Sequence, residues 1–203
     1  MLPVTSPTAP PSTFPLQLEL DAPTKVARWR PLVHWLLVIP HAIVLYAILF
    51  VQRFVYIVAW FAILFTGRMP EGLFGFNVMA MRYQWRVASY ILFLREGYPE
   101  FAFPMESEDP GTDPARLSIQ PAARLSRGLI FVKWLLAIPH YIVLLVLGIG
   151  AYVTIIIAFF AVLITGSWPA GLRNYIVGVM RWSTRVNAYI YLLTDVYPPF
   201  SLT

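Results

Sequence analysis

The stretches "HWLLVIPHA" at residues 34–42 and "KWLLAIPHY" at residues 133–141 are nearly the same apolar segment, written twice 99 positions apart. Sliding the chain over itself by 99 residues aligns 28–103 with 127–202 without a gap, and 32 of these 76 positions are identical. A whole unit is therefore duplicated. Duplicated membrane units usually pack about an approximate internal two-fold axis, and we expect one here.

The composition predicts an integral membrane protein. Apolar residues make up 59% of the chain and charged residues only 12%, with a mean hydropathy of +0.67. Two blocks, 31–67 and 129–166, contain one charged residue each, Arg53 and Lys133. About 20 consecutive apolar residues span the hydrocarbon core of a bilayer, so each block is long enough to do so.

The chain divides into four segments on these patterns. Residues 1–15 are rich in Pro, Ser and Thr, which predicts a disordered tail. The first membrane repeat covers 16–103, an acidic linker covers 104–114, and the second repeat covers 115–203. The net charge of +5 fits basic residues flanking membrane segments on the cytoplasmic side, and we do not expect nucleic-acid binding.

Two arrangements of each apolar block remain open. In the favoured one, the block is a helical hairpin that turns at its midpoint, where Gln52-Arg53 and Gly148–Gly150 stand at nearly equivalent positions. In the other, residues 24–38 form an amphipathic surface helix, a single span runs from Pro40 to Thr66, and 70–94 spans back. Both give an all-α fold of about four transmembrane helices, with interfacial amphipathic helices in the first arrangement and both termini on one side.

Short signals predict the ends of the elements. Gly67 and Gly166 fit helix C-terminal caps, and Pro70 and Pro169 fit the first turn of a following helix. The alternating segments 16–20 and 116–119, together with 101–103 and 200–202, predict a small cytoplasmic β element.

The segment after each Gly-Pro punctuation carries an arginine pair among aromatic residues. Arg82 and Arg86 in the first repeat match Arg181 and Arg185 in the second. A spacing of four places each pair on one helical face. Arginine and aromatic residues are typical of the membrane interface, so we expect these four side chains to contact lipid headgroups or a partner protein.

The second repeat, with "WLLAIPHY" (134–141), "TGSWPAGL" (165–172) and "GVMRWSTRVNAYIYLLTDVYPPF" (178–200), resembles a family of small bacterial tandem-repeat membrane proteins catalogued only as a domain of unknown function. The first repeat departs from it, with "YQW" at 83–85 in place of "WST". The resemblance implies a multi-pass protein of the bacterial inner membrane and no activity. The basic flanks predict cytoplasmic termini.

His41 and His140 are equivalent by the repeat and lie within the apolar blocks. Their simplest role is structural: each follows a helix-kinking proline and satisfies the carbonyls that the proline frees. The alternative is that the pair ligates a tetrapyrrole, haem or chlorophyll, in a helical bundle.

No enzyme signature is present, since the sequence lacks a nucleophile–histidine arrangement, a metal cluster and a phosphate-binding glycine loop. Without cysteine there is no disulfide and no thiolate metal site. By elimination we expect a non-catalytic accessory or scaffold subunit. It would pack against membrane lipids and a larger membrane complex, or form a homo-oligomer. A tetrapyrrole-binding subunit and a small channel or transporter are the alternatives.

Overall fold

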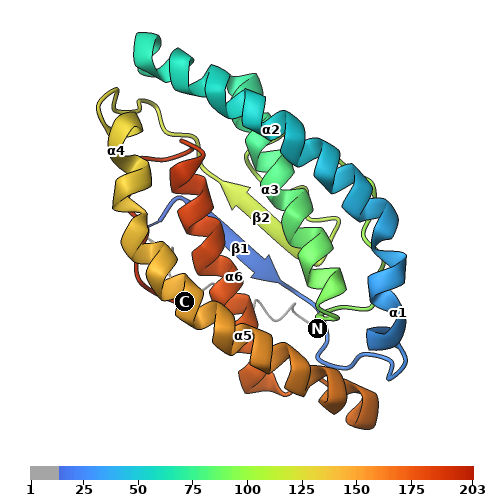
Figure 1. Cartoon of the computed structure of the whole chain (residues 1–203). Coiled ribbons are helices and arrows are strands. Elements are labelled where there is room, and N and C mark those ends of the chain that lie inside the picture. Colours follow the sequence, from blue (N-terminus) through green and yellow to red (C-terminus); the bar gives the residue numbers. More distant parts are fainter. Residues whose placement is uncertain (1–13) are drawn as a thin grey trace, which may run out of the picture.

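The computed structural model describes residues 14–203, so the tail predicted over 1–15 lies almost wholly outside the described residues. The described chain is mostly helical, with a two-stranded sheet (Figure 1). In chain order the elements are β1 Leu16–Leu20, α1 Arg30–Leu37, α2 Ile39–Thr66, α3 Glu71–Ile91, β2 Ala115–Ile119, α4 Leu129–Leu136, α5 Ile138–Thr165 and α6 Ala170–Ile190.

The sheet displays the expected two-fold relation directly. β1 and β2 pair antiparallel, with Leu18 opposite Leu117. These two residues are equivalent under the 99-residue repeat, and the neighbouring pairs Leu16–Ile119 and Leu20–Ala115 exchange with each other under the same operation. The symmetry axis therefore passes between Leu18 and Leu117, perpendicular to the sheet. The prediction that 16–20 and 116–119 form a β element is confirmed, whereas 101–103 and 200–202 stay outside it.

The two repeats are intertwined, because each strand packs beneath the helix of the other repeat. α3 lies against β2, and α6 lies against β1. The connecting segments cross over in the same way. The Val26 amide donates to the Gly166 carbonyl at 2.9 Å, and the Leu125 amide donates to the Gly67 carbonyl at 2.9 Å. Neither repeat completes its own core.

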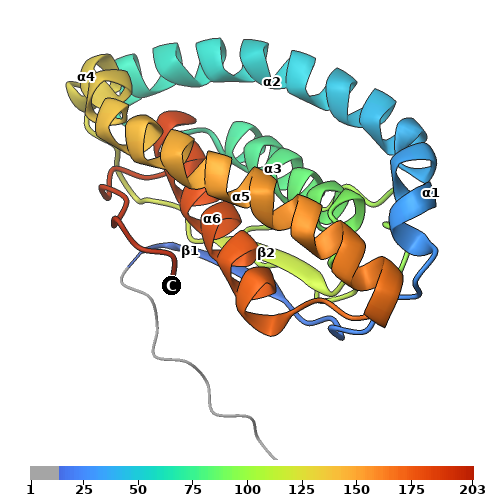
Figure 2. The ribbon, with the colours of Figure 1, turned by 60° about the horizontal axis from the view of Figure 1, so that its bottom comes forward.

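The long helices α2 and α5 form the outer layer, over α3 and α6, and the sheet forms the opposite side (Figure 2). Both long helices end as predicted, at glycines with left-handed backbone, Gly67 at φ 69° and Gly166 at φ 71°. Pro70 and Pro169 stand one residue before α3 and α6, at the N-cap rather than in the first turn. At the other end of each long helix, Pro40 and Pro139 mark the break from the short preceding helix.

The hairpin arrangement is wrong, because α2 and α5 run without interruption through the midpoints of the apolar blocks. The midpoint residues instead mark where each long helix packs on its neighbour. The buried Gln52 amide donates to Asn77 Oδ1 of α3 at 3.0 Å. In the second repeat the Tyr175 hydroxyl of α6 donates to the Leu147 carbonyl at 2.8 Å and passes beside Gly150.

The surface-helix arrangement is closer to the structure. A short helix precedes one long helix in each repeat, although α1 covers only Arg30–Leu37 of the expected 24–38. α3 and α6 do follow the long helices, but they are the central layer of the fold. Fourteen residues of α3 are buried, and the polar residues Asn77, Arg82, Arg86 and Ser89 are among them.

Candidate functional site

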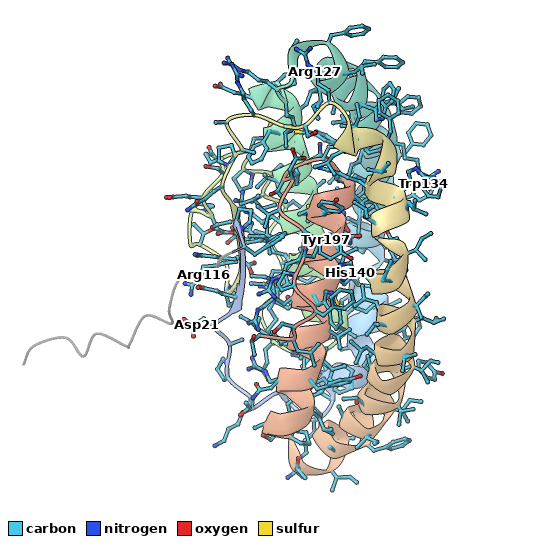
Figure 3. The ribbon with its side chains drawn as sticks, turned by 90° about the vertical axis from the view of Figure 1, so that its left-hand side faces the viewer. Asp21, Arg116, Arg127, Trp134, His140 and Tyr197 are labelled. Carbon is cyan, nitrogen blue, oxygen red and sulfur yellow. The ribbon has the colours of Figure 1, made fainter. Side chains whose placement is uncertain are left out.

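The outer face of α1–α2 and α4–α5 is the most unusual surface of the molecule. Phe65 is 72% exposed and Leu145 is 68% exposed, and side chains project from the outer side of both long helices (Figure 3). Large exposed apolar residues continue along both helix pairs: Trp29, Leu32, Trp35, Leu36, Ile43, Tyr46, Phe50, Phe54, Ile57, Phe61, Phe131, Trp134, Leu135, Ile142, Val146, Ile149, Tyr152, Ile156, Phe160 and Ile164.

A soluble monomer does not expose an apolar surface of this extent, since its largest patch is usually a few hundred Å². Ile39–Thr66 and Leu129–Thr165 are also the two segments of the described chain long and apolar enough to span a membrane. The predicted membrane character therefore rests on these two segments. α3 and α6 do not meet the same criteria.

The arginine pair of the first repeat is not at the surface. Arg82 and Arg86 are each about 1% exposed and point into the gap between α3 and the linker. The Asp109 carboxylate accepts from Arg82 Nε at 2.9 Å and from Arg86 Nη2 at 3.4 Å. Arg82 also donates to the carbonyls of Pro104, Glu106 and Leu117. Lipid headgroups cannot reach these guanidinium groups, so the expectation of lipid contact is wrong for this pair.

The arginine pair of the second repeat occupies the equivalent place under α6. Arg185 is buried and Arg181 is half-buried. Arg181 donates to the carbonyls of Leu18 and Leu202, and Arg185 donates to the Ser201 carbonyl at 3.5 Å. Burial lowers the pKa of both guanidinium groups from its ordinary value, but an arginine side chain stays charged at neutral pH. Both pairs tie a core helix to chain segments around the sheet.

His41 lies in an aromatic box built within the first repeat. Its ring is fully buried and stacks on Phe101 at 4.1 Å between ring centroids. Tyr98 lies beside the ring at 4.6 Å, and the Tyr83 hydroxyl contacts Nδ1 at 2.6 Å. We expected His41 to bond to a carbonyl that Pro40 frees. The partner of Nδ1 is instead the Tyr83 hydroxyl.

His140 repeats this box with one substitution. Phe200 stacks on its ring at 4.0 Å, and Tyr197 lies beside it at 4.8 Å (Figure 3). Trp182 Nε1 donates to Nδ1 at 3.1 Å, in place of the tyrosine hydroxyl of the first repeat. Because an indole only donates, His140 Nδ1 is an acceptor and the ring is neutral. The box therefore fixes the orientation of the ring.

The two histidines are not brought together, since each is enclosed by the aromatic residues of its own repeat. A tetrapyrrole needs an open ring nitrogen and a flat apolar slot beside it. Nε2 of each ring is buried and has no hydrogen-bond partner among the described residues, and a phenylalanine stacks on the face of each ring, so ligation of a tetrapyrrole through these histidines stays a prediction. Among residues 14–203 no cluster of three metal-ligating side chains is present.

The chain matches one known protein family along both of its repeats. It belongs to the family described as Domain of unknown function (DUF4389), whose model matches twice, at residues 28–103 and 127–201. The two matches coincide with the repeat found in the sequence. No curated protein matches the chain, and no solved structure matches it.

Sequence reasoning missed Asp109, which organises the first arginine pair. It lies in the linker 104–114, whose acidic and proline-rich composition predicts an exposed connection. In the structure its side chain is 3% exposed and also accepts from the Leu117 and Gly111 amides. A carboxylate is the partner that best compensates a buried arginine charge, and the acidic linker that follows the first arginine pair was the signal that could have identified Asp109.

Proposed function

We propose that this protein is a non-catalytic module of the bacterial inner membrane, which acts as an accessory or scaffold subunit. Its apolar outer face lies in the lipid, and its sheet side faces the cytoplasm. The observation that supports this proposal is the extent of exposed apolar surface on α1–α2 and α4–α5. The opposite side, formed by the sheet, carries charged residues such as Glu19 and Arg116.

We further propose that the two long helices lie in the plane of the membrane rather than crossing it. Arg53 is exposed and stands midway along α2. In a spanning helix it would lie at the bilayer centre, at a cost of about 3 kcal/mol. The exposed Glu19–Arg116 ion pair would then face lipid as well. In the in-plane orientation Arg53 reaches the headgroups and the ion pair stays in water.

The ends of the long helices support the same orientation. Exposed basic side chains gather there, at the turn after α2 and in the segments before α1 and α4: Lys25, Arg28, Arg68, Arg124 and Arg127. Basic residues near a membrane surface are each worth about 1 kcal/mol toward anionic lipid. They would add electrostatic binding to the apolar contact.

Depth measurements with single cysteines test the proposal, because the chain has no cysteine of its own. Ile43, Phe54 and Phe65 are exposed near the start, middle and end of α2. A fluorophore is attached to a cysteine at each site, and lipids that carry bromine at one shallow depth should quench all three fluorophores to the same extent. Gln17→Cys on the sheet side is the control and should be quenched only from water. The in-plane orientation would be contradicted if the fluorophore at position 54 lay deep in the bilayer while those at positions 43 and 65 lay at opposite membrane surfaces.

The accessory role is tested separately, by mild detergent extraction of the tagged full chain from native membranes. Recovery of a larger membrane complex with the protein supports the proposal. Recovery of the protein alone, or only as its own oligomer, would contradict a role as subunit of a larger complex.

A further inference from the structure

A polar cavity of about 170 Å³ lies between α3 and α6, close to the internal two-fold axis. Its lining is built from equivalent positions of the two repeats, such as Met81 with Met180 and Gln84 with Ser183. Thr184 and Asn187 of α6 complete its polar wall. The cavity is thus a product of the duplication.

Met81 and Trp85 of the lining belong to the same buried cluster as Leu18 and Leu117 of the sheet, which leaves the side of the long helices for the opening of the cavity. Beneath it the sheet is closed, because Leu18 is 3% exposed and Leu117 is fully buried. Seen from the outer side, α3 and α6 lie between the two long helices, α2 on one side and α5 on the other (Figure 1). The cavity between α3 and α6 is therefore flanked by α2 and α5.

The lining selects an uncharged polar group. It offers two amides, the Ser183 hydroxyl and the Thr184 hydroxyl, whose hydrogen is donated to the Met180 carbonyl. It contains no Lys, Arg, Asp or Glu that would pair with a phosphate or an amine. Gln84 Nε2 is buried and has no hydrogen-bond partner among the described residues. Buried donors in native proteins are normally satisfied, so this amide points to an acceptor that occupies the cavity.

We propose that the cavity binds the uncharged glycerol headgroup of a membrane lipid, with the acyl chains passing between α2 and α5 into the bilayer. This inference rests on the proposed membrane orientation. The volume corresponds to several water molecules at about 30 Å³ each, which suits a group of the size of glycerol. Glycerol hydroxyl and ester oxygens accept from Gln84 and Asn187, and its hydroxyls donate in return.

Photolabelling of the full-length protein tests this. The protein is reconstituted in phosphatidylcholine vesicles that contain a small fraction of diacylglycerol with a photoreactive group near the glycerol. We expect labelling on peptides that contain residues 81–88 and 180–187. Gln84→Leu and Asn187→Leu keep the side-chain volume and remove the hydrogen bonds, and each should weaken labelling about five- to ten-fold. Asn174→Leu, at an exposed position of α6, is the matched control and should label as wild type.

Flotation of the same vesicles separates the two proposals. A protein that does not float contradicts the membrane proposal itself. A protein that floats but is not labelled, or whose labelling survives both cavity variants, overturns the lipid site and leaves water as the occupant. Displacement of the probe by free glycerol as readily as by unlabelled diacylglycerol would overturn the lipid as the source of the bound group.

Discussion

The two repeats hold the same arginine pair at the same place, yet they surround it differently. In the first repeat Arg82 and Arg86 share the Asp109 carboxylate. In the second, Arg181 and Arg185 donate to backbone carbonyls, and among residues 14–203 no carboxylate forms an ion pair with either. The partner of the first pair comes from the linker, outside the repeated unit. Identical residues in a duplicated chain therefore need not have identical environments.

The largest expected effect is at Asp109. Asp109→Asn leaves two buried guanidinium groups without a carboxylate, which should reduce the free energy of unfolding by about 3–5 kcal/mol. Denaturant unfolding in detergent measures the loss. Glu108→Gln changes the neighbouring exposed acid and should have little effect. A loss below about 1 kcal/mol would mean that carbonyls alone suffice in the first repeat, as they do in the second.

The packing of the long helices gives a second contrast. The first repeat uses the Gln52–Asn77 bond, whereas the second places Gly150 beside the Tyr175 hydroxyl. A methyl group on Gly150 would lie 2.6 Å from that hydroxyl oxygen and 3.5 Å from the ring carbon behind it. Gly150→Ala should therefore cost about 1–3 kcal/mol through overpacking.

The double variant Gly150→Ala with Tyr175→Phe sharpens this test. Removing the hydroxyl relieves the clash, so the alanine should cost less in the Tyr175→Phe background than in wild type. Thermal unfolding of the four proteins measures the coupling. Additive costs would show that the close approach of α5 and α6 is not set by this pair.

The smallest expected effect is the contribution of His34 to the pH dependence of stability. His34 Nδ1 donates to the Tyr90 carbonyl at 2.7 Å, where the second repeat has Lys133 paired with Asp195. Burial lowers the pKa of His34, so the folded state holds it neutral while the unfolded chain takes up a proton near pH 6.5. Stability from this group is present above that pH and is lost as the pH falls.

Substitution of His34 isolates this contribution. His34→Gln keeps a donor for the Tyr90 carbonyl and removes the titrating ring. The variant should lose less stability than wild type when the pH is lowered from 7.5 to 5.5, as measured by thermal unfolding at both values. Parallel losses in the two proteins would assign the acid sensitivity to other groups.

The local signals at the ends of the long helices and in the two strands predicted the local structure correctly. The helix caps at Gly67 and Gly166 depend on left-handed backbone that glycine alone adopts without strain, so their positions follow from residue type. The strand alternation at 16–20 was correct for the same reason. The duplication predicted the two-fold arrangement, since equivalent apolar faces must be buried in equivalent ways.

The non-local features were not predictable from composition. Gln52 and Gly150 resemble turn residues, but they are explained by neighbours on α3 and α6 that lie about 25 positions away. The arginine pairs resemble interfacial residues, but their partners come from the linker and from the strand of the other repeat. The apolar composition predicted a membrane surface, but it did not show that α2 and α5 share one layer of the fold.

The pairing of Leu18 with Leu117 bears on the history of the gene. Every strand contact maps onto another when the repeats are exchanged, so two separate copies of one repeat would form the same sheet as the single chain. The molecule has the architecture of a homodimer whose subunits were fused end to end. In a single chain the two halves need not be identical, and Asp109, an acid in the joining segment, pairs with the arginines of one half and not with those of the other.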